Sequence, residues 1–192
     1  MWVDELNAVP QAIGLALAAC IVVVSGANGL HSVHATEVRP GAGVASPPSP
    51  ETLKSLADWI SAKTGWANEE LPSIRIVSRE ALAELFHGKI DDPKPVAVEA
   101  AYAMEEHTIY LSNRWNSDSL RDTSVLLHEL VHHLQITNKV EVPCREHYDL
   151  RAYDLQIEWL REQGIRGPYK FLNINEAAIF ALSQCGDYWG EW

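Results

Sequence analysis

The residues with the clearest chemical meaning are His128, Glu129 and His132, which form an H-E-x-x-H pattern. Two histidines at i and i+4 lie on one face of an α-helix, so both imidazoles can bind one Zn²⁺. Glu129 lies beside the metal rather than on it, where a carboxylate can act as general base on a water that the metal activates. The pattern therefore indicates a zinc centre with hydrolytic chemistry.

The helix that carries this pattern should be buried, because apolar residues surround the motif on nearly all sides. They are Val125, Leu126, Leu127, Leu130, Val131, Leu134 and Ile136. Buried His and Glu side chains need partners, and a metal ion supplies one. The alternative is a core helix whose histidines bond to backbone groups or carboxylates.

The segment Leu127–His133 resembles the active-site helix of zincin metallopeptidases, especially that of compact bacterial gluzincin-like domains. The likeness covers roughly residues 98–160, and only the H-E-x-x-H core is a specific match. The resemblance implies an α+β fold, mainly helical, with a short antiparallel sheet or hairpin packed over the H-E-x-x-H helix. It also implies zinc-dependent hydrolysis of peptide bonds.

A third protein ligand is expected, because a catalytic zinc usually keeps three protein ligands and one water. Pro143 predicts the start of a second helix, over residues 144–163. If the two helices are antiparallel, the position that faces the midpoint of His128 and His132 lies about six residues in, near Asp149.

Two carboxylates on this second helix remain candidates for the third ligand. Glu146 and Asp149 are spaced i and i+3, so both can face the same way. The gluzincin resemblance favours Asp149, because Asp149 to Ala152 matches the Glu-x-x-Ala pattern of that family with Asp in place of Glu. Glu176 ranks lower, since a Glu in the first turn of a helix is explained by the helix dipole.

Other residues of the second helix suggest supporting roles. A hydroxyl of Tyr148 or Tyr153 near the metal could stabilise the oxyanion of a tetrahedral intermediate, although aromatic packing is the alternative for each. Cys144 and Cys185 are an even pair once Cys20 is set aside, and they predict one disulfide in an oxidising compartment. Two buried thiols are the alternative in a cytosolic protein.

Caps and turns predict the elements that position these residues. The expected elements are a helix capped by Ser49 and ended by Gly65, a strand over 73–78, a helix over Arg79–His87 capped by Ser78, and a hairpin of 96–104 and 107–112 that turns at Glu105-Glu106. The second hairpin strand leads to the H-E-x-x-H helix. The zincin resemblance implies that such a strand lies above the metal and that its free edge binds extended substrate.

The chain divides into a segment over residues 1–35 that is signal peptide-like or membrane-anchoring, a Pro/Gly/Ser linker over 36–50 and one zincin-like domain over 51–192. Residues 12–25 form an apolar run of signal-peptide length, and Ala35 ends a small-residue cleavage site. The acidic start, with Asp4 and Glu5 but no Lys or Arg, is atypical. Cys20 ends a lipobox-like sequence, so lipidation and a retained anchor stay open. The expected location is exported, periplasmic or envelope-associated.

The net charge limits the classes of binding partner that the chain can have. The formal net charge is −11, and without residues 1–35 it is −9, from 24 acids against 15 bases. Such a surface disfavours nucleic acid and anionic membranes. We expect a peptide or protein substrate, membrane attachment only through the N-terminal segment, and one Zn²⁺ per chain. The competing hypothesis is a non-catalytic envelope binding domain in which a degenerate zincin site staples two helices. A third is a helical domain without metal.

Overall fold

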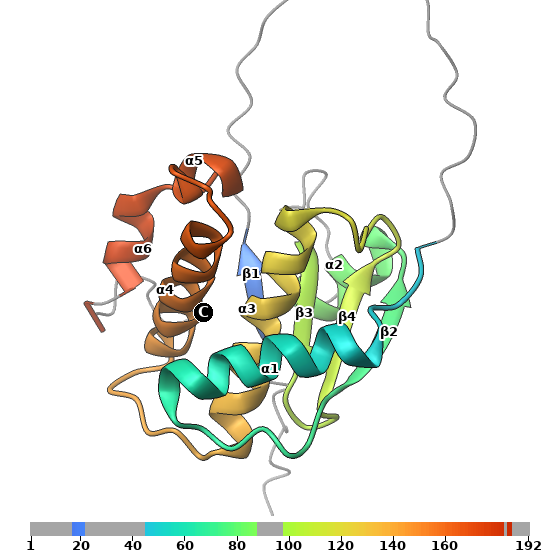
Figure 1. The fold of residues 1–192 in the computed structure, drawn as a ribbon, viewed down its shortest axis with the longest axis horizontal. Helices are drawn as coiled ribbons and strands as arrows, with labels where there is room; N and C mark the ends of the chain where they lie inside the picture. Colours follow the sequence, from blue (N-terminus) through green and yellow to red (C-terminus); the bar gives the residue numbers. More distant parts are fainter. Residues whose placement is uncertain (1–16, 22–44, 88–97, 183, 186–192) are drawn as a thin grey trace, which may run out of the picture.

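The computed structural model describes residues 17–21, 45–87, 98–182 and 184–185. Over these residues the chain forms an α+β fold of six helices and a small mixed sheet (Figure 1). The elements are β1 Leu17–Ile21, α1 Pro50–Thr64, β2 Ser73–Val77, α2 Arg79–His87, β3 Val98–Ala103, β4 Thr108–Ser112, α3 Leu120–Thr137, α4 Glu146–Glu162, α5 Pro168–Leu172 and α6 Glu176–Leu182.

The sheet has the strand order β1-β3-β4-β2. The predicted hairpin is confirmed, because β3 and β4 pair antiparallel, with Tyr102 opposite Ile109. The expectation of a purely antiparallel sheet is wrong, because β2 pairs parallel with β4, with Ile74 beside Ile109. The chain runs from β2 through α2 to β3, and the hairpin then returns β4 between β3 and β2. β4 therefore has neighbours on both sides and no free edge, contrary to the edge expected for substrate.

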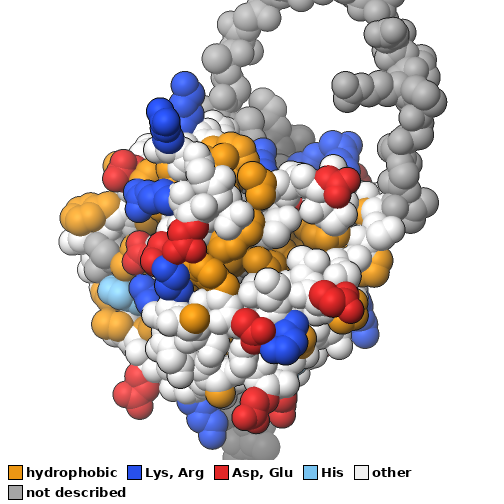
Figure 2. Space-filling view, viewed as in Figure 1, with side chains coloured by type: hydrophobic (Ala, Val, Ile, Leu, Met, Phe, Trp, Pro, Cys, Tyr) orange, Lys and Arg blue, Asp and Glu red, His pale blue; other side chains and the backbone are white. Residues whose placement is uncertain are grey.

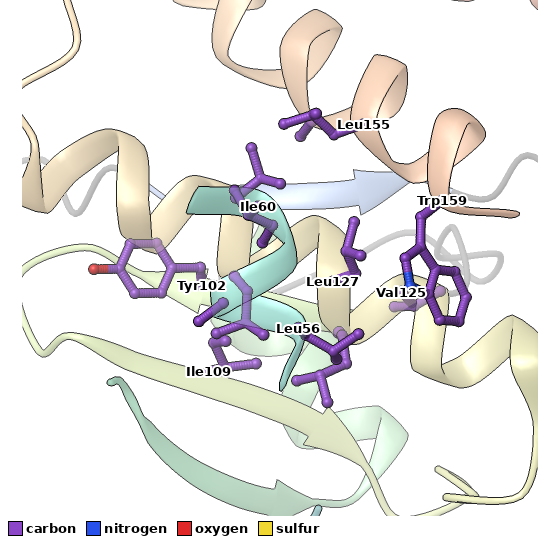
Figure 3. Packing of buried hydrophobic residues seen from close by; sticks show 14 of the residues in the cluster. Leu56, Ile60, Tyr102, Ile109, Val125, Leu127, Leu155 and Trp159 are labelled. Carbon is purple, nitrogen blue, oxygen red and sulfur yellow. The ribbon is translucent and has the colours of Figure 1, made fainter. Parts of the chain in front are cut away.

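Helices cover both faces of the sheet, and the alternation of β3 shows which residues meet them (Figure 1). Ala100 and Tyr102 point to the core shared with α1 and α3, whereas Ala101 and Ala103 pack with Leu82 of α2. Figure 3 shows the larger core, to which α1, α3, α4 and the sheet all contribute. α3 is thus enclosed by α1, α4 and the sheet, which explains why its apolar residues surround the H-E-x-x-H motif.

The predicted ends of α1 and α2 are confirmed. The Ser49 hydroxyl accepts a hydrogen bond from the Thr52 N–H, with Pro50 in the first turn. Gly65 closes α1 in the left-handed region at φ 76°, a conformation that favours glycine. Ser78 likewise accepts from the Ala81 N–H at the start of α2. These local caps determine where the helices begin and end.

The N-terminal segment contributes one described element. β1 pairs antiparallel with the outer edge of β3, with Ala18 opposite Tyr102 and a register shift between Ala19 and Ile21. The rest of the predicted export segment and most of the predicted linker lie outside the described residues. Among the helices that the structure describes, none has both the length and the apolar character needed to cross a bilayer.

Candidate metal centre

The H-E-x-x-H motif lies in the middle of α3, which begins at a Ser119 cap whose hydroxyl accepts from the Asp122 N–H. His128, Glu129 and His132 are 0%, 0% and 1% exposed. The predicted burial of this helix is confirmed. Burying two imidazoles and a carboxylate is costly unless each finds a partner, so the surroundings of these three residues decide what they do.

α4 brings a third candidate ligand to the two histidines. The contacts between α3 and α4 run from Gln135 beside Tyr148 to Ser124 beside Gln156, so the helices are antiparallel, as expected. Asp149 Oδ1 lies 3.3 Å from His132 Nε2 and 3.7 Å from His128 Nε2. These atoms have no hydrogen-bond partner among the described residues, and all lie within 4.8 Å of one another.

The spacing of these three atoms fits a zinc ion. Bonds of 2.0–2.2 Å at tetrahedral angles place two ligand atoms about 3.4 Å apart. The two distances to Asp149 Oδ1, 3.3 and 3.7 Å, are close to that value. Two imidazole nitrogens and one carboxylate oxygen are also the donor set of a catalytic zinc site, which leaves the fourth position for water. The residues therefore fit Zn²⁺, and small movements would complete the geometry.

Two glutamines hold the other ring nitrogens of the histidines. Gln156 Oε1 lies 3.2 Å from His128 Nδ1, and Gln135 Oε1 lies 3.0 Å from His132 Nδ1. An amide oxygen only accepts, so both Nδ1 atoms carry a proton, and Nε2 is the nitrogen that each histidine can offer to a metal. Such outer partners fix the tautomer and orientation of metal-binding histidines. The two glutamines therefore hold both imidazole rings in place through Nδ1, the nitrogen that does not face Asp149.

Both glutamines are in turn held in place. Gln156 donates from Nε2 to Ser124 Oγ at 3.2 Å, and Gln135 donates from Nε2 to the Tyr148 carbonyl at 3.1 Å. Gln135 and Gln156 are both 0% exposed. Neither glutamine was predicted from the sequence. A glutamine at a position of an amphipathic helix that should be apolar was the available signal, because a buried amide needs partners.

The two histidines favour the ionised form of the Asp149 carboxyl group. Burial raises the pKa of Asp149, but its contacts with His128 and His132 outweigh burial and hold the pKa well below the usual range. Burial lowers the pKa of His128. Burial also lowers the pKa of His132, yet Asp149 and the charge of Glu129 outweigh it, so the net shift is upward. Asp149 is therefore ionised at neutral pH, and its negative charge suits a bound cation.

The other candidate ligands lie elsewhere. Glu146 is at the first residue of α4, one turn before Asp149, and it is not among the clustered ligand atoms. An i, i+3 pair shares a helix face but is separated by about 4.5 Å along the axis, so only Asp149 reaches the level of the histidines. Glu176 is exposed in the first turn of α6. Neither residue is brought to the site.

The two tyrosines predicted near the metal differ in position. The Tyr153 ring lies edge-on to the His128 ring, with centroids 4.5 Å apart, so Tyr153 is at the site. The Tyr148 hydroxyl donates to the Val140 carbonyl at 3.0 Å and holds the loop between α3 and α4. The structure thus gives the Tyr148 hydroxyl a contact in this loop, and its role as an oxyanion stabiliser stays a prediction.

His133, the histidine after the motif, serves the fold. Its Nδ1 accepts from the Tyr102 hydroxyl at 3.1 Å, and its Nε2 donates to the Glu70 carbonyl at 2.8 Å. His133 is 1% exposed, and burial lowers its pKa. It points about 100° away from His132 on α3. This histidine therefore joins the helix to the sheet and to the loop before β2.

The predicted disulfide pair is joined in the structure, between Cys144 before α4 and Cys185 after α6. The bond ties the start of the helix that carries Asp149 to the C-terminal part of the described chain. His147 Nδ1 lies 3.0 Å from Cys144 Sγ and 3.1 Å from Cys185 Sγ. Two cysteine sulfurs and a histidine nitrogen thus lie together at a second place in the fold, apart from the H-E-x-x-H motif.

The candidate ligand atoms are shielded from solvent, because His128 Nε2, His132 Nε2 and Asp149 Oδ1 are all buried. The Asp149 side chain is 28% exposed, against 0% and 1% for the two histidines. On the face shown in Figure 2, acidic and basic side chains are interspersed, and hydrophobic side chains show between α4 and α1. A separate open hollow of about 580 Å³ is lined by Gln135, Tyr148 and the loop between α3 and α4.

These features define an α+β domain with a candidate metal centre between two antiparallel helices. A family model described as a domain of unknown function, DUF6647, matches residues 45–187. The chain therefore belongs to this family, and the match includes α3, α4 and every residue of the candidate metal centre. No curated protein and no solved structure matches the chain significantly.

Proposed function

We propose that the chain is a zinc-dependent metallopeptidase of the zincin type, similar to compact gluzincins. The observation that supports this most strongly is the convergence of His128 Nε2, His132 Nε2 and Asp149 Oδ1 at separations suited to one Zn²⁺. Glu129, the general base of the H-E-x-x-H pattern, is fully buried beside them. A chance arrangement of core residues would not be expected to unite this motif with a third ligand from another helix.

The proposed reaction is the hydrolysis of a peptide bond by water. Zn²⁺, when bound, supplies Lewis acidity that makes the water more acidic and polarises the peptide carbonyl. Glu129 takes one proton from the attacking water and passes it to the leaving amine, so the products are a carboxylate and an amine. His128, His132 and Asp149 hold the ion, while Gln135 and Gln156 orient the two imidazoles.

The substrate and location follow from the same proposal. The substrate is a peptide or an exposed segment of a protein, and the chain acts as an exported, periplasmic or envelope-associated enzyme. The sequence 1–35 supports export by its apolar run and its small-residue cleavage site.

Glu129→Gln tests the role of Glu129. The variant keeps the size of the side chain but removes the base, so zinc content should be unchanged while hydrolysis of a fluorogenic peptide library falls at least 10³-fold. Glu146→Gln is the matched control, because it neutralises a carboxylate of α4 outside the cluster. Full activity of Glu129→Gln would overturn the proposed mechanism.

The burial of the cluster favours a second candidate function, a metal-stapled binding domain without catalysis. Only Asp149 among the three ligands is appreciably exposed, and a structural zinc site has no open position. Cobalt substitution separates the two functions. A hydroxamate that changes the cobalt spectrum would indicate an open position, and a spectrum indifferent to hydroxamate would favour the structural role.

A further inference from the structure

We propose that Cys144, His147 and Cys185 form a second metal site, which binds a thiophilic ion such as Zn²⁺ when their disulfide is reduced. The three ligand atoms are the sulfurs of the two cysteines and Nδ1 of His147, and they lie within 4.8 Å of one another. This inference is independent of the proposed peptidase activity.

The ligands converge from two parts of the chain. Cys144 lies just before α4 and His147 is in the first turn of this helix, with the His147 N–H donating to the Cys144 carbonyl at 3.1 Å. Cys185 follows α6, which packs on α4. The fold therefore places Cys185 beside this first turn over a sequence separation of 41 residues. A C-x-x-H pair completed by a distant cysteine is a typical arrangement of zinc ligands.

The position of His147 is the main evidence for a ligand role. Its Nδ1 lies 3.0 Å from Cys144 Sγ and 3.1 Å from Cys185 Sγ, so the ring faces both sulfurs at once. A disulfide does not need a histidine beside it. Two thiolates and an imidazole are preferred zinc ligands, and Zn–S bonds of 2.3 Å with a Zn–N bond of 2.0–2.1 Å require S···N separations of about 3.5 Å.

The change from disulfide to metal site requires little movement. The sulfurs would separate from bonding distance to about 3.8 Å, which is a shift of under about 2 Å shared by two side chains. The Cα atoms are 5.6 Å apart, which suits the disulfide and leaves room for an ion between the sulfurs. Cys185 is exposed, and Cys144 and His147 are partly exposed, so a reductant, an ion and a water as fourth ligand can reach the site.

The two states are mutually exclusive and chemically balanced. A dithiol reductant gives two electrons and two protons, which break the S–S bond to form two thiols while the reductant becomes a disulfide. Binding of Zn²⁺ then releases the two thiol protons to solvent.

The second site is separate from the first one. His147 and Asp149 are two residues apart on α4, so their side chains point about 200° apart around the helix. The His128, His132 and Asp149 cluster contains no sulfur, which gives the two sites different spectra. Cobalt bound by thiolates shows an intense near-ultraviolet charge-transfer band, and cobalt bound by nitrogen and oxygen does not.

The test uses the full chain with Cys20→Ser, so that only Cys144 and Cys185 can supply thiols. The oxidised protein is first saturated with Zn²⁺, excess ion is removed, and the protein is divided into oxidised and dithiol-reduced, reductant-free samples under nitrogen. Titration with Co²⁺ should give a charge-transfer band that saturates at one ion per chain in the reduced sample only. Added Zn²⁺ should abolish the band.

Variants identify the ligands. Cys144→Ser or Cys185→Ser should abolish the band, and His147→Ala should weaken cobalt binding at least tenfold. Glu146→Gln, in the same helical turn, should bind as the parent does. Circular dichroism checks folding, and His147→Gln serves as a second variant if His147→Ala is unfolded. The absence of a charge-transfer band in the reduced parent would overturn the site, and an unchanged affinity in both His147 variants would overturn the ligand role of His147.

Discussion

Gln156 on α4 lies with its side-chain oxygen 3.2 Å from Nδ1 of His128 on α3, while its amide nitrogen donates to Ser124. One glutamine thus spans the two helices and fixes the ring orientation of a histidine in the candidate metal centre, with the proton on its Nδ1. This relationship connects the packing of α3 on α4 with the chemistry of the candidate metal centre.

Replacing Gln156 with Leu should weaken zinc binding by about 10- to 100-fold, because His128 loses the partner that holds its tautomer. The affinity is measured by competition with a chromogenic chelator. Gln163→Leu, at the exposed end of the same helix, is the matched control. Equal affinities of both variants and the parent would show that Gln156 has no orienting role.

Asp149→Ala should reduce zinc affinity at least 100-fold, because it removes one of three ligands, whereas Glu146→Ala should bind normally. The two residues lie one turn apart on α4, so the pair compares the position of a carboxylate rather than its charge. Zinc content after dialysis provides the measurement. A parent chain that holds no metal would contradict the zinc site itself and favour a helical domain without metal.

Zinc binding should become tighter as pH rises, because protons compete with the ion for His132. The Asp149 contact and the charge of Glu129 outweigh burial and raise the pKa of His132 above 6.5, so in the metal-free chain the proton persists to higher pH than on an ordinary histidine. Zinc must displace it. Calorimetry near pH 7 in two buffers of different ionisation enthalpy should therefore show proton release, and identical heats in both buffers would argue against it.

The Tyr102 hydroxyl should make the fold sensitive to alkali. Burial raises the pKa of Tyr102 to about 12, against 10 for an exposed phenol. Between these values the unfolded chain loses the proton and the folded chain keeps it, so the free energy of unfolding falls as pH rises. A shift of two units corresponds to about 3 kcal/mol. Urea unfolding at pH 9 and pH 11.5 should show about 2 kcal/mol of this loss, because pH 11.5 is still below the pKa of the folded state.

Tyr102→Phe supplies the comparison for that measurement. The variant should be less stable at neutral pH by about 1 to 3 kcal/mol, because His133 Nδ1 loses its buried donor. Its stability should nevertheless fall less steeply in alkali. A parallel pH dependence of parent and variant would assign the alkaline loss to other groups, such as Tyr110, whose contact with Glu106 raises its pKa.

The local elements were predictable because their signals are local. Ser49 with Pro50, Ser78 and Gly65 mark helix ends through bonds that each residue makes within its own turn. The parallel pairing of β2 with β4 could not be read in the same way, because it depends on how the chain returns after α2. Non-local pairing leaves no trace in the pattern of a single strand.

The candidate site was also predictable in its local part, the motif on α3, but not in the contacts that α4 makes with it. His128, Glu129 and His132 follow from helical periodicity, but the level at which α4 meets them depends on the loop between the helices. Asp149 was favoured over Glu146 by the family resemblance alone, and both stayed candidates until the helices were placed side by side. Gln156 escaped notice because a single glutamine on a helix is ordinary, and only its burial against His128 shows its role.

The pairing of β1 with β3 would have a consequence for the surface of the protein if the predicted cleavage takes place. Cleavage after Ala35, as the sequence predicts, would remove β1 together with the export segment. The precursor satisfies the outer backbone groups of β3 within its own chain, whereas the processed form would present them to any extended strand that approaches. The precursor and the processed form would then differ in their tendency to pair with other chains through the edge of β3. The timing of a single proteolytic cut would decide which of the two forms a neighbouring chain meets.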